Sequence, residues 1–174
     1  MGAWGAIIMS FFGALFFALT LTLQFHWKGS RLGLPFLGFT VILLLASRVI
    51  RLPGKGISPS KKGERAIMWS TIGEGVGLFI AANVVVNVHH SEMLLSAMAL
   101  VVGLHFLPIA YAETFHPFYA LAITLLLGAA VGFAMPPPVG GMIAGFATGG
   151  ALWVASLLAI VRDHQAKRRI LQPS

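Results

Sequence analysis

Long apolar runs, separated by short polar segments, follow one another along the chain. A helix that crosses the hydrocarbon core of a bilayer needs about 20 mostly apolar residues, within a range of about 17 to 25. Six runs reach that range, at residues 4–25, 34–50, 66–88, 93–112, 118–134 and 139–161. The pattern predicts an all-α fold, a polytopic membrane helix bundle with six transmembrane helices. We expect residues 1–161 to form this single domain and residues 162–174 to form a basic cytoplasmic tail.

The distribution of positive charge predicts the orientation of these spans. With six spans, both termini and the polar segment at residues 51–65 lie on one side of the membrane. That side collects ten of the twelve Lys and Arg residues, namely Arg48, Arg51, Lys55, Lys61, Lys62, Arg65, Arg162, Lys167, Arg168 and Arg169. Only Lys28 and Arg31 lie on the other. Because cytoplasmic segments carry the excess of Lys and Arg, we expect both termini in the cytoplasm.

Composition supports a membrane location and excludes several other classes of protein. Residues of the hydrophobic class make up 57% of the chain and charged residues only 10%, against roughly 25% charged in soluble domains. The basic residues cluster beside spans, so no nucleic-acid partner is expected. Such a rim attracts anionic lipid headgroups at about 1 kcal/mol per residue near the surface. A small-molecule ligand and a homo-oligomer both remain compatible with this composition.

Patterns that the sequence lacks exclude further kinds of chemistry and processing. The chain has no cysteine, which excludes disulfides, thiolate metal sites and cysteine nucleophiles. The apolar run at residues 3–25 is longer than that of a typical signal peptide and has no basic residue before it, so we expect a retained span. No nucleophile arrangement or phosphate-binding loop is present, and we expect neither an enzyme nor a cofactor.

Glu74 is the residue with the strongest functional implication, because it lies inside an apolar span. A carboxyl group at that depth costs roughly 2.5 to 3.5 kcal/mol on insertion scales unless it is neutralised, paired or hydrated. At a rise of 1.5 Å per residue, Glu74 and His105 both lie about 4.5 Å to the cytoplasmic side of their span midpoints. Trp153 reaches a similar depth. A carboxyl and an imidazole at one level predict an intramembrane pair that binds a proton or a polar ligand.

A purely structural interpretation of these residues remains open. Glu74 fits equally well as a protonated group hydrogen-bonded to another helix, or as a partner of Arg48. His105 fits as a core histidine with satisfied hydrogen bonds. Pro108 lacks an N–H group and therefore leaves the carbonyl of Leu104 without its helical donor, which favours a kink one turn from His105.

Two asparagines add polar groups to the span that contains Glu74. Asn83 and Asn87 are four residues apart and share a helix face, and at 100° per residue Asn83 lies about 180° from Glu74. Polar groups on two sides predict a central position for this span and make both asparagines candidate ligand-binding residues. Interhelical hydrogen bonds of about 0.6 kcal/mol each are the simpler explanation.

Histidines at the opposite side of the membrane form a weaker pattern. His89, His90 and Glu92 lie together in one loop, and His26 lies in the other. Histidine and carboxylate are ligands for zinc and similar metals. Because no spacing places the two adjacent histidines on one helical face, we predict no metal site here.

Small residues recur every four positions in the last two spans. Ala120, Thr124, Gly128 and Gly132 do so in the fifth span, and Gly141, Gly145 and Gly149 in the sixth. Small residues at this spacing let helix backbones approach closely. We expect these two helices to pack tightly against each other; a hinge or a pore lining is the alternative use of the glycines.

One short segment carries a resemblance to known proteins. The stretch Gly103, Leu104, His105, Phe106, Leu107 and Pro108, followed by Phe118 and Tyr119, resembles a G-x-H-x-L-P segment of small bacterial multi-pass proteins of the YvaD type. The resemblance covers about a quarter of the chain. It implies a multi-pass protein of the bacterial inner membrane and draws attention to His105.

Together these patterns predict an integral membrane protein with two candidate functions. The first is a small-molecule or ion carrier that binds a proton or polar ligand at Glu74 and His105. The alternative is a non-transporting membrane sensor or accessory subunit that acts through helix packing.

Overall fold

The computed structural model describes residues 2–54, 56–113 and 115–171, and in these ranges the chain forms helices and no strand. The six long helices are α1 (Ala3–Phe25), α2 (Leu34–Arg51), α3 (Lys61–Asn87), α4 (Leu94–Glu113), α5 (His116–Ala134) and α6 (Val139–Leu171). Two short 3₁₀ helices, η1 (Gly29–Gly33) and η2 (Ser91–Met93), precede α2 and α4. The predicted all-α fold is confirmed.

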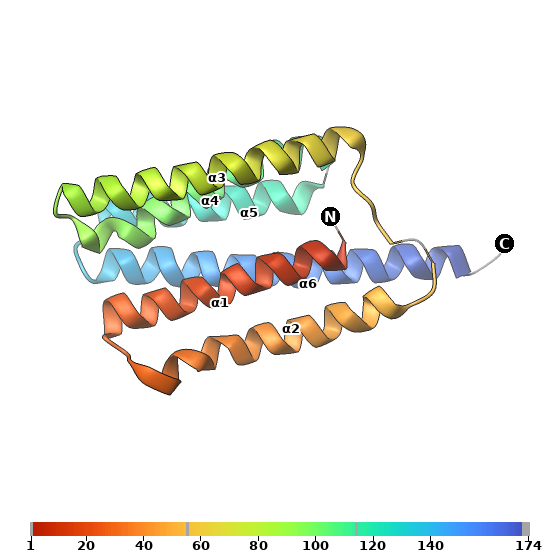
Figure 1. Ribbon diagram of the computed structural model, residues 1–174, viewed down its shortest axis with the longest axis horizontal. Helices are drawn as coiled ribbons and strands as arrows, with labels where there is room; N and C mark the ends of the chain where they lie inside the picture. The colour runs from red at the N-terminus through yellow and green to blue at the C-terminus, as the bar shows by residue number, and fades with distance from the viewer. Residues whose placement is uncertain (1, 55, 114, 172–174) are drawn as a thin grey trace.

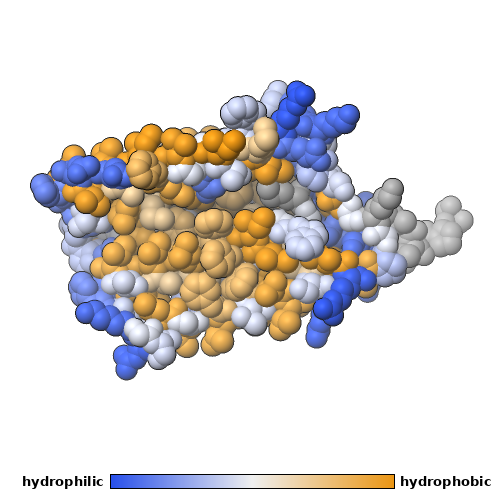
Figure 2. All heavy atoms as spheres, viewed as in Figure 1, coloured by the Kyte–Doolittle hydropathy of each residue, from blue (hydrophilic) through white to orange (hydrophobic). Residues whose placement is uncertain are grey.

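The six helices run side by side along the long axis of the molecule (Figure 1). Each is long and apolar enough to cross a membrane. Hydrophobic side chains form a belt between two hydrophilic ends of the molecule (Figure 2). Trp69 and Phe79 of α3 are 67% and 70% exposed, and such exposure of large apolar side chains is unfavourable in water but not in lipid. The chain is therefore a multi-pass membrane protein.

The helix at the centre of the bundle is α6, which packs against α1, α2, α4 and α5. By contrast, α3 packs mainly on α4 and lies at the edge. The predicted central position of the third span is wrong. The prediction assumed that Asn83 needs a neighbouring helix, whereas its side-chain amide donates to the Phe79 carbonyl of α3 itself, at 2.7 Å.

Gly141, Gly145 and Gly149 of α6 face α1 rather than α5. A Cβ atom at Gly145 would collide with the Thr20 side chain, and one at Gly149 would lie 2.9 Å from the Phe17 ring and 3.1 Å from the Gly13 carbonyl oxygen. The backbones of α1 and α6 therefore approach as closely as small residues permit. The predicted strip exists, but its partner is the first helix.

Close packing of α5 on α6 is also present, through different residues of α6. A Cβ atom at Gly132 would lie 2.9 Å from the Ala144 Cβ, and one at Gly128 would lie 3.4 Å from the Ala147 Cβ. The predicted pairing of the last two helices is confirmed. Thr124 lines a groove between the two helices, and its hydroxyl donates to the Ala120 carbonyl of its own helix at 2.8 Å.

Helix α6 continues beyond the predicted end of its span at residue 161 and reaches Leu171. Asp163 in this extension is 4% exposed; its Oδ2 accepts from the Ala3 N–H at 3.2 Å and its Oδ1 from the Ile57 N–H at 2.7 Å. The carboxylate thus binds an otherwise unpaired N–H at the start of α1 and holds the α2–α3 connection in place.

Lys167 lies one turn further along α6 and is 5% exposed. Its Nζ donates to the carbonyls of Val49, Ile50 and Leu52, at 2.8, 3.0 and 3.1 Å. These carbonyls belong to the last turn and the C-cap of α2, where helical donors run out and a positive charge is favoured. The Val49 carbonyl also accepts from the Leu52 N–H, at 3.2 Å. We call this end of the molecule, with both termini and the α2–α3 connection, the basic end.

Candidate functional site

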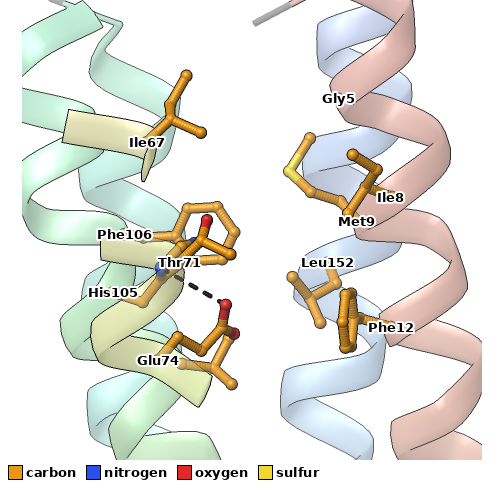
Figure 3. A pocket seen from close by; sticks show the side chains of 11 residues that line it. Gly5, Ile8, Met9, Phe12, Ile67, Thr71, Glu74, His105, Phe106 and Leu152 are labelled. Atoms are coloured by element: carbon orange, nitrogen blue, oxygen red, sulfur yellow. Dashed lines mark ion pairs between the residues drawn. The ribbon is translucent and has the colours of Figure 1, made fainter. Parts of the chain in front are cut away.

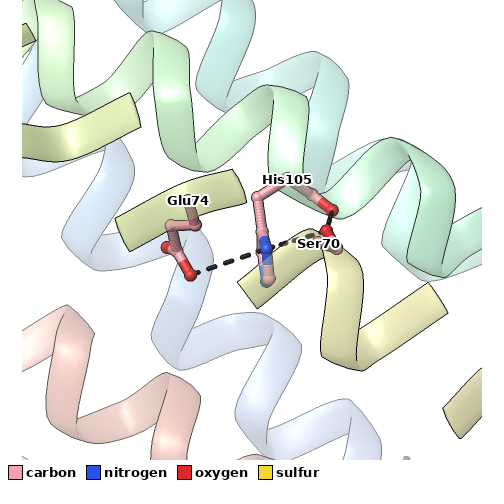
Figure 4. Close-up of polar contacts among 3 residues, drawn as sticks. All are labelled: Ser70, Glu74 and His105. Carbon is pink, nitrogen blue, oxygen red and sulfur yellow. Dashed lines mark hydrogen bonds and ion pairs between the residues drawn. The ribbon is translucent and has the colours of Figure 1, made fainter. Parts of the chain in front are cut away.

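Glu74 and His105 lie against each other on neighbouring helices, α3 and α4 (Figure 4). The Glu74 Oε2 is 3.5 Å from the His105 Nδ1. The side chains are 13% and 9% exposed, respectively. The adjacency predicted from their equal depth is confirmed. It arises because α3 and α4 form an antiparallel hairpin joined by a short connection at residues 88–93.

Ser70 completes the group and was not predicted. Its hydroxyl donates to the His105 backbone carbonyl at 2.6 Å, and its Oγ lies 2.9 Å from the His105 Nδ1. A hydroxyl has one proton, so once that proton is given to the carbonyl the Oγ accepts from the ring. The spacing offered a signal, since Ser70 and Glu74 are four residues apart and share a helix face.

This arrangement determines the tautomer of a neutral His105. The ring proton sits on Nδ1, where Ser70 accepts it and the Glu74 carboxylate lies close by. Among the described residues no hydrogen bond engages the other ring nitrogen, Nε2. In the neutral ring this nitrogen is an acceptor with an available lone pair.

Pro108 lies within α4, which continues past it to Glu113. The proline removes the donor of the Leu104 carbonyl. The next carbonyl, that of His105, accepts the hydrogen bond from Ser70. The site therefore sits where α4 has lost part of its own hydrogen bonding and α3 supplies a donor.

A cavity of about 170 Å³ lies beside the pair, between α1 and α6 on one side and α3 and α4 on the other (Figure 3). Most of its wall is apolar and includes Ile8, Met9, Phe12, Phe106 and Leu152. The polar part of the wall consists of Thr71, Glu74 and His105. A carboxyl group and an imidazole are thus presented to a largely apolar space.

The pair is also reached from a second side. A hollow of about 300 Å³ between α3 and α4 is lined by Ser70, Gly73, Gly77, Glu74 and His105, together with Val101, Leu104 and Pro108. Gly73 and Gly77 leave room there because they carry no side chain. Glu74 and His105 therefore line two separate hollows.

The charge of the pair changes by one unit when it takes up one proton. An ionised Glu74 with a neutral His105 carries −1, and protonation of either group brings the pair to zero. A monovalent cation next to the carboxylate has the same neutralising effect. The pair can thus bind either a proton or a monovalent cation, and binding of one makes the other unnecessary for neutralising the charge.

The two asparagines do not belong to this site. Asn83 and Asn87 are both exposed, and neither lines the cavity or the second hollow. Arg48, the alternative partner of Glu74, lines a different groove between α2 and α6. Trp153 faces α1 and α2, with its Nε1 donating to the Ser10 carbonyl at 3.0 Å and its ring against Gly38.

At the end opposite the basic end, the histidines do not converge. His90 Nδ1 lies 2.8 Å from Glu92 Oε1 in an exposed pair. His26 and His89 have positive φ angles of 54° and 59°, each at the end of a helix. Within the residues that the structure describes, no group of three or more His, Asp or Glu side chains could hold a metal ion.

Comparisons of the chain with protein-family models, with curated proteins and with solved structures found no match.

Proposed function

We propose that the protein is a small carrier of the bacterial cell membrane, with both termini in the cytoplasm, in which Glu74 and His105 bind a proton in exchange for a cationic ligand. The observation that carries the proposal is the position of the pair on the wall of the cavity between α1 and the α3–α4 hairpin. Ionisable residues inside membrane spans are costly and mark ion or substrate pathways.

The geometry supports a division of labour between the two residues. Glu74 supplies the negative charge that a cation or proton neutralises. His105 keeps its Nδ1 proton towards Ser70 and Glu74, which leaves Nε2 to accept a second proton. The imidazolium formed in this way is balanced by the carboxylate 3.5 Å away, so a bound cation is no longer needed.

The packing of the helices supports a route to the pair. Helices α1 and α3 border the cavity but make little direct contact with each other. Helix α3 is therefore able to move relative to α1 without separating a packed interface between these two helices. Alternating access in membrane carriers commonly uses such movements of one bundle against another.

The test is proton movement in proteoliposomes that contain a pH-sensitive dye. Imposed gradients of Na⁺, of K⁺ and of a lipophilic amine serve as probes. We expect the wild-type protein to move protons in exchange for at least one of these cations, in the direction opposite to the movement of that cation. Glu74→Gln should reduce the rate at least tenfold, since the amide carries no negative charge for a cation or proton to neutralise, and His105→Ala should flatten the pH dependence.

Glu92→Gln is the matched control, because it removes an exposed carboxyl at the end of the molecule opposite the basic end. It should leave the rate unchanged. If the Glu74 and His105 variants retain full pH-dependent movement, the pair is structural and has no place in a transport mechanism.

A second candidate function rests on the exposed position of α3. This helix packs mainly on α4, and Gly63 and Val85 are its buried residues. An accessory subunit or sensor would use such a face to hold a helix of a partner protein. Failure of the wild-type protein to move any of the three probes would favour this role over the carrier.

A further inference from the structure

A groove between α2 and α6 lies at the basic end of the molecule, away from the Glu74–His105 pair. Its volume is about 650 Å³. Its apolar wall includes Leu45 of α2 and Leu157 and Val161 of α6, and its polar wall includes Arg48, His164 and Arg168. We call it the α2–α6 groove.

The polar and apolar residues of this groove are sorted along the helix axis. On α6, Leu157 and Arg168 are eleven residues apart, which corresponds to about 16 Å. The apolar residue lies nearer the middle of the bundle and the arginine nearer the basic end. On α2 the same order holds, because Leu45 precedes Arg48 and the helix ends at Arg51. The apolar part of the groove therefore lies towards the level of the hydrocarbon core, and its cationic part lies towards the level of the lipid headgroups.

The positive charges of the groove are available to a ligand. Arg48 and Arg168 are exposed, and among the described residues neither forms an ion pair. No acidic side chain lines the groove. Asp163, the acidic residue nearest in the sequence, points to another face of α6, where it accepts from the N–H groups of Ala3 and Ile57.

Neighbouring contacts hold the two walls in position. Lys167 lies between His164 and Arg168 in the sequence but is turned away from the groove, and its Nζ binds the carbonyls at the end of α2. These hydrogen bonds fix the last turn of α2, which carries Arg48, to the turn of α6 that carries Arg168. The spacing of the two backbone turns that carry Arg48 and Arg168 is thus set by buried contacts.

We infer that the α2–α6 groove binds one anionic phospholipid. Its phosphate lies between Arg48 and Arg168, with His164 as a further donor, and an acyl chain lies along Leu45, Leu157 and Val161. Guanidinium groups match phosphate oxygens in geometry and charge. Basic pockets between membrane helices are suited to anionic lipid headgroups. The apolar wall favours a lipid over a free phosphate, and the site does not depend on the carrier proposal.

The test compares lipid retention by the purified full-length protein in native mass spectrometry after incubation with phosphatidylglycerol or phosphatidylcholine. We expect one phosphatidylglycerol to remain bound to the wild-type protein and phosphatidylcholine to dissociate. Arg48→Gln/Arg168→Gln should weaken phosphatidylglycerol binding about tenfold or more. Leu157→Trp, which fills the apolar wall and keeps both charges, should also weaken it.

The matched control is Arg51→Gln/Arg169→Gln, which removes two charges from the same end but from residues outside the groove. It should retain the lipid, and helix content measured by circular dichroism should be the same in all variants. Equal loss in both double variants would overturn the proposal in favour of diffuse charge attraction. Equal retention of phosphatidylcholine, or of glycerol phosphate without acyl chains, would also overturn it.

Discussion

At the residue scale, Asp163 and Lys167 show how buried charges can serve the backbone. They are one turn apart on α6, yet Asp163 binds the start of α1 and Lys167 the end of α2. Each charge has the sign that the helix end favours, negative at an N-terminus and positive at a C-terminus. One turn of the central helix therefore fixes the ends of two others.

Lys167→Met should destabilise the protein, because it leaves three carbonyls at the end of α2 without their charged donor. Hydrogen bonds to charged groups contribute about 1.5 to 3 kcal/mol, and we expect a loss in that range. Unfolding in mixed detergent micelles, followed by circular dichroism, measures it. Arg169→Met is the control, since Arg169 is exposed. Equal stability of the two variants would contradict the capping role.

The pair of Glu74 and His105 shows the opposite use of charge. Here the polar groups border two hollows instead of being enclosed by donors. Ser70 orients the imidazole but leaves Nε2 unengaged. The stability of the bundle does not require this arrangement, and for this reason we propose Glu74 and His105 as the ligand-binding residues.

At the element scale, α6 organises the bundle through two different surfaces. Gly141, Gly145 and Gly149 pack against α1, whereas Ala144 and Ala147 pack against Gly132 and Gly128 of α5. In lipid, helices associate through close packing and hydrogen bonds because the surrounding chains are as apolar as leucine. An increase in side-chain volume should therefore weaken helix association most at the contacts made by glycine and alanine.

Gly145→Leu should separate α1 from α6, since even a Cβ atom there collides with Thr20. Overpacking of this kind costs about 1 to 3 kcal/mol. The melting temperature in detergent should fall, and the elution peak of the protein in size-exclusion chromatography should become broader. Gly150→Leu on the same helix is the control, because a Cβ at Gly150 meets no atom within 4 Å. A normal melting temperature for Gly145→Leu would refute the close α1–α6 contact.

At the scale of the whole molecule, both termini and the α2–α3 connection gather at the basic end (Figure 1). The η1 segment and the α3–α4 connection lie at the other end. The excess of Lys and Arg at the basic end favours the cytoplasm for that side. The orientation of the protein in the membrane can therefore be measured by labelling one introduced residue at either end of the molecule.

The chain has no cysteine, so Ser30→Cys and Ser58→Cys each introduce a unique thiol. Ser30 is exposed in η1 and Ser58 is exposed at the basic end. In intact cells, a membrane-impermeant maleimide should label position 30 at least tenfold faster than position 58. Permeabilised cells should label both. The reverse pattern in intact cells would invert the predicted orientation.

The sequence by itself determined the number and order of the helices, because the apolar length needed to cross a bilayer is a local property of each segment. It also predicted that Glu74 and His105 lie at the same depth, since consecutive antiparallel spans place residues of equal depth at one level; that the two side chains face each other is decided by the packing of α3 on α4. The helix ends were less predictable. The last span continues past residue 161 because Asp163 and Lys167 bind groups distant in the chain.

Only the tertiary structure decided which helices are neighbours. The sequence showed the strip of Gly141, Gly145 and Gly149 but not that it faces α1, and it showed Asn83 but not that the amide is satisfied within α3. Lateral arrangement depends on the fit of side chains between helices, since hydrophobicity does not distinguish a helix face from lipid. For the same reason, the role of Ser70, the cavity beside Glu74 and the α2–α6 groove were visible only in the folded molecule.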